Sequence, residues 1–407
     1  MKNFAGNKVV IIGQGYVGLP LAAAAATEGW NVVGIEKSIK ILDLIANKKS
    51  PIEDISDEKI AEILNNGSYE ITNDESRISE GNIIILCVPT PIDEANQPDM
   101  SYMESAVESI AKHSSDGALI ISESTSYPGT LRSFIIPRVK NSKSTQKLFF
   151  ATAPERINPR DKKWNLKNTP RLVSGIDEDS SQLALVFYKS ICNDVILVDS
   201  PEIAEISKLL ENTFRLVNIS LINEFARICN VMDVDIYKIV EAANTKPYGF
   251  MPFNPGIGIG GHCIPVDPLY FVWWAKQNNL KTPIIQQSIN TNDEMPEHYF
   301  NMITSKYALQ ETKKRIMLIG VAYKSGISDV RNSPVSSLKL LFEKAGHTVI
   351  WHDPLVAEWE NTRSCSLDEE CDLIILTVNQ PGIDLRLIQS KNTPIYDCTN
   401  TLVHNQT

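Results

Sequence analysis

The chain has 407 residues, of which 43% are hydrophobic and 22% charged, with a net charge of -10 at pH 7. This length predicts two or three domains, and the composition excludes a disordered chain. The acidic balance argues against nucleic acid as a partner, and no apolar run is long enough for a membrane helix. Seven scattered cysteines without a CxxC pair predict free thiols and a cytoplasmic protein. The dispersed histidines predict no metal site.

Short β-branched runs alternate with helical segments in the first part of the chain. We expect strands at residues 8–12, 31–35, 83–88, 118–122 and 148–151, and an Ala-rich helix that ends near Gly29. This alternation predicts a parallel sheet covered by helices on both faces.

The middle of the chain has a different pattern. Apolar residues recur at helical spacing over residues 201–240, which predicts one long amphipathic helical region and a surface for a homodimer. A second α/β unit follows, with strands expected at 315–320, 348–351, 373–378 and 394–397 and a helix at 334–344. The fold class is therefore predicted to be α/β: two Rossmann-like, doubly wound parallel-sheet domains joined by a central long helix or helical domain.

A glycine turn follows the first predicted strand. Gly13 permits the tight turn, Gly15 lets the backbone approach a pyrophosphate, and Gly18 lets the helix pack closely on the sheet. Glu36 ends the second strand, where its carboxylate can accept the ribose hydroxyls and repel a 2′-phosphate. Although Lys37 beside it weakens the argument, the context favours NAD over NADP.

A second glycine-rich run, residues 256–268, contains Cys263 and, four residues later, Asp267. A lone cysteine is often a small core residue, but a cysteine in such a loop is a candidate nucleophile. Lys208 and Asn212 are four apart on the predicted central helix and therefore share a face. They fit either an oxyanion site or a solvated helix surface.

Two polar loops follow buried strands. Residues 153–156 contain Glu155 and Arg156, and residues 124–130 contain Thr125. Ligands of parallel sheets bind beyond the carboxyl ends of the strands. Both loops are therefore candidate parts of a site, although each fits an ordinary connection equally well.

Together these segments resemble the UDP-glucose/GDP-mannose dehydrogenase family over nearly the whole chain and in the family's order. The resemblance also rests on other segments: residues 88–91, Val-Pro-Thr-Pro; residues 260–267, Gly-Gly-His-Cys-Ile-Pro-Val-Asp; and residues 322–324 with 329–334. It implies an NAD-binding domain at 1–198, a helical dimerisation and catalytic-loop domain at 199–305, and a UDP-sugar-binding domain at 306–407.

The resemblance also implies roles for individual residues. Cys263 attacks a C6 aldehyde, and Lys208 and Asn212 stabilise the oxyanion. Asp267 assists proton transfer or holds the catalytic water and the lysine. Thr125 and Glu155 position water, and Glu155 is a candidate base for thioester hydrolysis. Expected substrate contacts are Glu155, Arg156, Lys208, Asn212, Phe253, Gly256, Gly260 and Lys324. Expected cofactor contacts are Gly13, Gly15, Tyr16, Val17, Gly18, Glu36, Pro89, Thr90, Thr125 and Arg331.

The expected reaction is the NAD-dependent, four-electron oxidation of a UDP sugar at C6 to the uronic acid, for surface polysaccharide precursors. His262 and Val266, with the lead-in at 245–253, resemble the branch that acts on UDP-N-acetylhexosamines, in particular UDP-N-acetylglucosamine. UDP-N-acetylmannosamine and UDP-glucose are alternatives. Arg160 stands where related sequences often have glycine, which leaves the shape of that loop open.

Two hypotheses of other kinds remain. A hydroxyacid-type or phosphogluconate-type dehydrogenase shares the N-terminal layout but forms one NADH per turnover. An inactive regulator that binds NAD or a nucleotide sugar forms none. The presence of Cys263 together with Lys208, Asn212 and Asp267 argues against the regulator.

Overall fold

The chain divides into two units. A computed structural model describes residues 6–93, 95–142, 146–158, 161 and 163–404. The first unit comprises Met1–Glu211 and Leu269–Asn279, and the second comprises Asn212–Pro268 and Leu280–Thr407.

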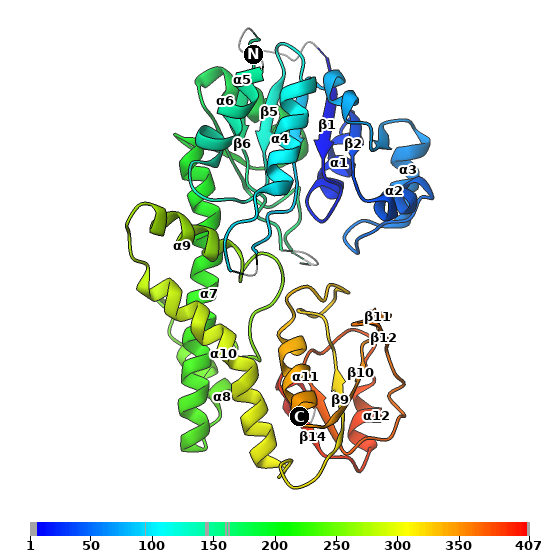
Figure 1. Cartoon of the computed structure of the whole chain (residues 1–407), viewed down its shortest axis with the longest axis vertical. Helices are drawn as coiled ribbons and strands as arrows, with labels where there is room; N and C mark the ends of the chain where they lie inside the picture. The colour runs from blue at the N-terminus through cyan, green and yellow to red at the C-terminus, as the bar shows by residue number, and fades with distance from the viewer. Residues whose placement is uncertain (1–5, 94, 143–145, 159–160, 162, 405–407) are drawn as a thin grey trace. The chain divides into compact units, whose positions relative to one another are not determined.

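The first unit is built on an eight-stranded sheet with the order β3-β2-β1-β4-β5-β6-β7-β8 (Figure 1). Its strands are β1 Lys8–Ile12, β2 Asn31–Ile35, β3 Tyr69–Thr72, β4 Ile83–Leu86, β5 Leu119–Ser122, β6 Phe149–Thr152, β7 Arg171–Gly175 and β8 Val195–Leu197. Neighbouring strands from β3 to β6 are parallel, β7 is antiparallel to β6, and β8 is parallel to β7. The prediction of a parallel sheet is confirmed for the strands from β3 to β6. Strands β3, β7 and β8 were not predicted from the sequence.

Both faces of this sheet are buried, as the alternating strand residues require. Val9 and Ile11 of β1 belong to one core cluster, and Val10 and Ile12 belong to a second. The first cluster includes residues of α1 (Gly18–Thr27), α3 (Asp57–Asn65) and α6 (Glu178–Ile191). The second includes residues of α4 (Ser101–His113) and α5 (Ile136–Ser142). Three other helices lie between β2 and β6 in the sequence: α2 (Ile39–Ala46) and the short η1 (Glu75–Glu80) and η2 (Leu131–Ile135). Helices on both faces leave the strand ends as the open edges for ligands.

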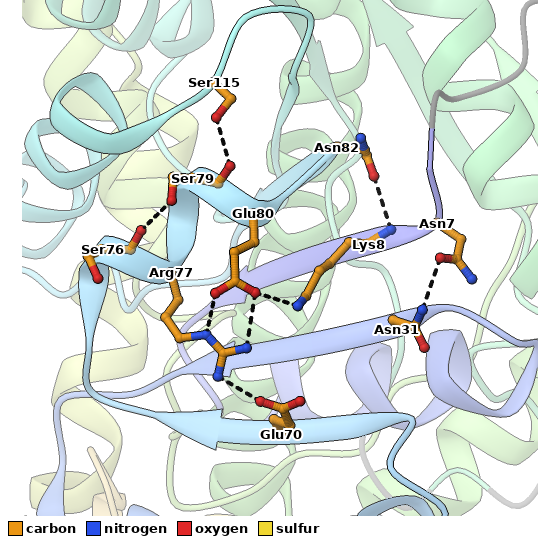
Figure 2. Close-up of polar contacts among 10 residues, drawn as sticks. All are labelled: Asn7, Lys8, Asn31, Glu70, Ser76, Arg77, Ser79, Glu80, Asn82 and Ser115. Atoms are coloured by element: carbon orange, nitrogen blue, oxygen red, sulfur yellow. Dashed lines mark hydrogen bonds and ion pairs between the residues drawn. The ribbon is translucent and has the colours of Figure 1, made fainter.

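A polar cluster closes the amino ends of the strands (Figure 2). Arg77 pairs with Glu70 at 2.6 Å and with Glu80 at 2.6 Å, and Lys8 pairs with Glu80 as well. The hydrogen bonds from Arg77, and then from Lys8, lower the pKa of Glu80 to about 2. These partly exposed ion pairs join η1 to β1 and β3 at the edge opposite the glycine turn.

The long helix α7 runs over Pro201–Met232 and contributes residues to both units. The predicted helical region to residue 240 is interrupted, because Asp233 adopts a left-handed backbone with φ 55°. A separate helix, α8 (Ile236–Asn244), then begins at Asp235, whose side chain accepts the backbone N–H of Tyr237. Two further helices, α9 (Asp267–Gln277) and α10 (Pro283–Lys306), follow the cysteine-containing loop.

The second unit contains a four-stranded parallel sheet with the order β10-β9-β13-β14. Its strands are β9 Arg315–Ile319, β10 Thr348–His352, β13 Leu373–Leu376 and β14 Ile395–Asp397. Other elements are α11 Pro334–Lys344, α12 Leu385–Ser390, α13 Thr401–His404 and the hairpin β11 Glu358–Trp359 with β12 Thr362–Arg363. The four strands and α11 confirm the second predicted α/β unit.

None of the helices in the described part of the chain is both long and apolar enough to cross a membrane. Within the same residues, no three His, Cys, Asp or Glu side chains are grouped in a way that could hold a metal ion.

Candidate active site

The glycine turn has the geometry that a nucleotide phosphate needs. Gly13 has φ +93°, and a Cβ on Gly18 would lie 1.9 Å from the Gly13 carbonyl oxygen. A Cβ on Gly15, by contrast, would meet nothing within 4 Å. The N-cap of α1, Val17, offers no side-chain cap, and the first turn contains no acidic residue. The backbone N–H groups of this helix start can therefore face an anion.

Tyr16 and Val17 pack against the first core cluster. The Tyr16 hydroxyl donates to Glu53 at 3.3 Å. These contacts fix the residues that lead into α1, so the turn is anchored on the sheet.

Glu36 lies next to the turn because β1 and β2 are parallel neighbours. Its carboxylate accepts the backbone N–H groups of Gln14 at 2.8 Å, Lys37 at 2.9 Å and Ser38 at 2.8 Å. The Lys37 ammonium points elsewhere, to Ser105 at 2.7 Å and Glu75 at 3.0 Å. The Lys37 ammonium, which could otherwise bind the 2′-phosphate of NADP, is thus paired with other side chains. This arrangement favours NAD over NADP.

The next three parallel strands deliver the polar loops to the same edge. Pro89 and Thr90 follow β4, Thr125 follows β5, and Glu155 follows β6. The segment after β4 is held by the Tyr270 hydroxyl of α9, which donates to the Pro91 carbonyl at 2.9 Å.

The loop that contains Thr125 is joined to α7 through Glu205. The Glu205 carboxylate accepts the backbone N–H groups of Gly129 at 2.6 Å and Leu131 at 3.0 Å. Burial raises the pKa of Glu205 to about 7, although the two backbone N–H groups oppose this rise. Glu205 was not predicted from the sequence as a site residue, since its position on α7 also fits a solvated helix face.

The Glu155 carboxylate, after β6, accepts hydrogen bonds on both oxygens. Its Oε1 accepts the backbone N–H of Ile157, and its Oε2 accepts Arg171 Nη2 at 2.8 Å. Burial alone would raise the pKa of Glu155, but the charges of Arg171 and Lys208, together with backbone N–H groups, lower the pKa overall. Lys208 on α7 is only 8% exposed, so it is not part of a solvated helix face.

Arg156, expected at the substrate, is paired within the protein. It donates to Glu211 of α7 at 2.5 and 3.1 Å and to the Pro170 carbonyl at 2.9 Å. Arg160, which stands where related sequences often have glycine, lies outside the described residues.

In the second unit, the start of α9 assembles three of the expected catalytic residues. The Cys263 carbonyl accepts the backbone N–H of Asp267 at 2.8 Å, so the two residues are one turn apart. The Asp267 carboxylate accepts the Asn212 amide of α7 at 2.5 Å, and both side chains are buried. Cys263 itself is only partly buried, so the thiol is not a residue of the packed interior.

The glycine-rich loop before Cys263 is held by asparagines that the sequence analysis missed. Asn292 of α10 accepts the backbone N–H of Ile259 at 2.6 Å, and Asn223 of α7 accepts that of Gly256 at 3.0 Å. A Cβ on Gly260 would lie 2.7 Å from Tyr323 Cβ. Glycine is therefore required at position 260 for close packing.

The remaining expected residues lie nearby in sequence or contact. Phe253 packs edge-on against Phe214 of α7, with ring centroids 6.1 Å apart. Arg331 donates to Asp329 at 2.6 Å and lies 3.3 Å from His262 Nδ1. Lys324 is half-buried. The expected residues therefore fall into two groups, one at the carboxyl edge of the first sheet and one in the second unit.

Comparison with known protein families identifies the family of this chain. Residues 7–192 match the NAD-binding domain of the UDP-glucose/GDP-mannose dehydrogenase family, residues 202–294 its central domain, and residues 317–404 its UDP-binding domain. The chain belongs to this family. It is an NAD-dependent oxidoreductase of the sugar-nucleotide dehydrogenase type, and the open turn at Gly15 and the engaged Lys37 fit that cofactor.

Similar proteins cover nearly the whole chain. A UDP-N-acetyl-D-mannosamine dehydrogenase of Methanococcus maripaludis is 34% identical over 98% of this chain and 94% of its own. A UDP-N-acetyl-D-glucosamine 6-dehydrogenase of Pseudomonas aeruginosa is 34% identical over 81% and 78%. The solved structure of a UDP-D-ManNAc dehydrogenase from Pyrococcus horikoshii has a TM-score of 0.87 at 30% identity, over 96% of this chain and 95% of that one.

Proposed function

We propose that the protein oxidises the C6 hydroxyl of a UDP-N-acetylhexosamine to the carboxylate in two successive steps, with Cys263 as the covalent anchor. The observation that carries the proposal is the start of α9. There the partly exposed Cys263 lies one turn before Asp267, whose carboxylate binds the amide of Asn212. A partly exposed thiol one helical turn before a buried amide–carboxylate pair suits capture of a carbonyl carbon and control of its oxygen.

Each step gives the chain's residues a defined task. When bound, NAD⁺ accepts one hydride from C6 in each of the two oxidations. Lys208 and Asn212 donate to O6 and stabilise its negative charge. Cys263 Sγ, as thiolate, forms a bond to the C6 aldehyde, which keeps the aldehyde on the protein for the second oxidation.

Hydrolysis completes the reaction. Water adds to the resulting thioester, the C6–Sγ bond breaks, and the thiolate of Cys263 leaves. Thr125 and Glu155 orient this water, and the ionised Glu155 carboxylate can accept its proton. Asp267 holds the Asn212 amide in position. Two NAD⁺ and one water are consumed for each sugar.

The choice of sugar lies between two N-acetylhexosamines. The mannosamine dehydrogenases align over nearly the whole chain, which favours UDP-N-acetylmannosamine. The glucosamine dehydrogenase from Pseudomonas aeruginosa and the loop containing His262 and Val266 support UDP-N-acetylglucosamine as the second candidate. Either product is a uronic acid suited to surface polysaccharide synthesis.

The test combines a substrate panel with product counting. UDP-glucose and the UDP derivatives of N-acetylglucosamine, N-acetylmannosamine and N-acetylgalactosamine are compared by kcat/KM, and NADH is counted per sugar consumed. We expect two NADH per sugar and the highest kcat/KM for an N-acetylhexosamine. One NADH per sugar, or full acid formation by Cys263→Ala, would remove the covalent mechanism.

We also propose that a second copy of the chain covers α7. Large apolar side chains that are 37–89% exposed lie along this helix in two runs, residues 203–214 and residues 221–232. They are Ile203, Ile206, Leu210, Phe214, Leu221, Phe225, Ile228, Val231 and Met232. Exposed apolar runs at helical spacing are typical of a helix-mediated interface.

A cytoplasmic location remains part of the proposal. Cys87, Cys192, Cys229 and Cys398 are buried thiols that form no disulfide. Buried thiols suit a reducing compartment, where NAD⁺ and nucleotide sugars are also available.

A further inference from the structure

An arginine deep in the first unit binds two carboxylates at the edge where Glu155 lies. Arg171 Nη2 donates to Glu155 Oε2 at 2.8 Å, and Nη1 donates to Glu123 Oε2 at 3.3 Å and to the Ala153 carbonyl at 3.1 Å. The Tyr188 hydroxyl donates to the other oxygen of Glu123. The side chains of Arg171 and Glu123 are 3% and 0% exposed.

The antiparallel strand β7 explains why this arginine reaches the site. β6 pairs with β7 through Thr152 opposite Ser174 and Ala151 opposite Gly175. Continuing that register past the end of β6 brings Arg171, the first residue of β7, beside Glu155. Had β7 run parallel to β6, its first residue would lie at the far edge of the sheet.

Burying these charges without an oppositely charged partner would cost free energy of desolvation. A buried carboxylate tends to take up a proton, and a nearby opposite charge prevents this. The ionisable groups around Glu155 are Arg171 on β7, Lys208 on α7, Glu123 after β5, Tyr188 and Cys192 at the end of α6, and Cys87 after β4. Only Arg171 and Lys208 among them favour an ionised Glu155.

We propose that Arg171 is a positioning residue that fixes the Glu155 carboxylate in its ionised form, with Glu123 and Tyr188 holding the guanidinium from behind. This inference rests on the proposed function, in which Glu155 orients and deprotonates the hydrolytic water. Both Glu155 oxygens already accept a hydrogen bond. A carboxylate oxygen can accept more than one hydrogen bond, so a carboxylate held in this way can align a water without rotating.

Burial also sets the state of the group behind the arginine. Burial raises the pKa of Glu123 to about 7, although Arg171 opposes the rise. Glu123 therefore competes with Glu155 for the guanidinium most strongly above neutral pH. Removing Glu123 and removing Arg171 should consequently act on Glu155 in opposite directions.

Three variants test this difference: Arg171→Met, Arg171→Lys and Glu123→Gln. The readout is the pH dependence of kcat on the UDP-N-acetylhexosamine that the wild-type enzyme oxidises fastest. We expect Arg171→Met to lower kcat at pH 7 by about ten- to a hundredfold and to move the acid limb to higher pH. Arg171→Lys keeps the charge but not the fork, so its effect should have the same direction and a smaller size. Glu123→Gln should leave the limb in place or move it to lower pH.

Rapid mixing separates this role from general damage. If hydrolysis is the slowed step, Arg171→Lys should release two NADH per site in a burst before a slow steady state. Arg77→Met is the matched control, because Arg77 also pairs with two glutamates but at the opposite edge of the sheet (Figure 2). It should show neither the burst nor the shifted limb.

The outcomes distinguish this inference from the proposed function. Wild-type enzyme that does not form two NADH per sugar removes the function itself. Wild-type enzyme with the correct count overturns only the role of Arg171 if its variants show no burst, or if Arg171→Lys and Glu123→Gln move the acid limb in the same direction. Should Arg171→Met not fold, Arg171→Lys and Glu123→Gln carry the same comparison.

Discussion

Alanine at Gly15 and at Gly18 should separate cofactor binding from folding. At Gly18, the new Cβ would lie 1.9 Å from the Gly13 carbonyl oxygen and 3.1 Å from Cys87 Cβ. Ordinary contact begins at 3.4 Å, so α1 would have to withdraw from the turn by about 1.5 Å. Overpacking of this kind costs about 1–3 kcal/mol. The melting temperature should fall by about 2–4 °C for each kcal/mol in a unit of this size.

At Gly15, the same methyl group meets nothing within 4 Å, and the residue is not left-handed. Gly15→Ala should therefore fold with unchanged stability, or gain up to about 1 kcal/mol from a less flexible unfolded chain. The methyl group would instead occupy the space where the cofactor's pyrophosphate approaches the backbone. We expect KM for NAD⁺ to rise by about five- to a hundredfold, with KM for the UDP sugar little changed.

The assay is thermal unfolding with and without NAD⁺, together with steady-state kinetics for both variants. Gly15→Ala should have the wild-type melting temperature in the absence of NAD⁺ and lose most of the shift that NAD⁺ produces. Gly18→Ala should melt earlier in both conditions. Normal NAD⁺ affinity in a well-folded Gly15→Ala variant would refute the assignment of the pyrophosphate to this turn.

Three other perturbations have defined outcomes. Replacing the exposed Leu210 and Phe225 of α7 together by Asp should convert a dimer to monomers in analytical ultracentrifugation; an unchanged mass contradicts the α7 interface. Because burial raises the pKa of Glu205 to about 7, the folded state holds its proton more firmly than the unfolded state, so this group reduces stability as pH rises from about 4.5 to 7. Glu205→Gln should be less stable overall but flatten that part of the pH profile of unfolding; an unaltered slope contradicts the shift. Asn292→Ala removes the acceptor of the Ile259 N–H and should lower kcat by about tenfold with KM for NAD⁺ unchanged, whereas equal losses in both would point to global damage.

Local sequence signals predicted the elements that are buried on both sides. The runs at β1, β2, β4, β5 and β6 are short, apolar and followed by turn residues, so strand and edge could both be predicted. The edge strand β8 lacks this signal, because Ile196 and Leu197 are 48% and 38% exposed. The end of α7 was also missed. A non-glycine residue with a positive φ at Asp233 leaves no clear mark in the hydrophobic period.

For the candidate site, the sequence suggested candidate ligand-contacting residues more readily than the residues that hydrogen-bond to the surrounding loops. Cys263 and Asp267 stand out because glycine density is rare and has a physical cost. Asn292 and Asn223 do not, since each is one polar residue on a helix, and only the fold shows the backbone N–H that each accepts. The precise geometry of a site depends on such supporting residues, which come from positions far apart in the chain.

Arg171 shows the limit most clearly, since strand direction decides its role. Its strand β7 lies between β6 and β8, and nothing local to residues 171–175 shows that the first residue of this strand binds two carboxylates. The antiparallel pairing of β7 with β6 turns the strand's first residue toward the ligand edge, where Glu123 and Glu155 supply two negative charges. With Lys208, the four charges sum to zero when all are ionised, so the edge can hold a carboxylate away from water without a net buried charge. That charge balance depends on β5, β6, β7 and α7 together, and it cannot be predicted from the sequence of any one of these elements.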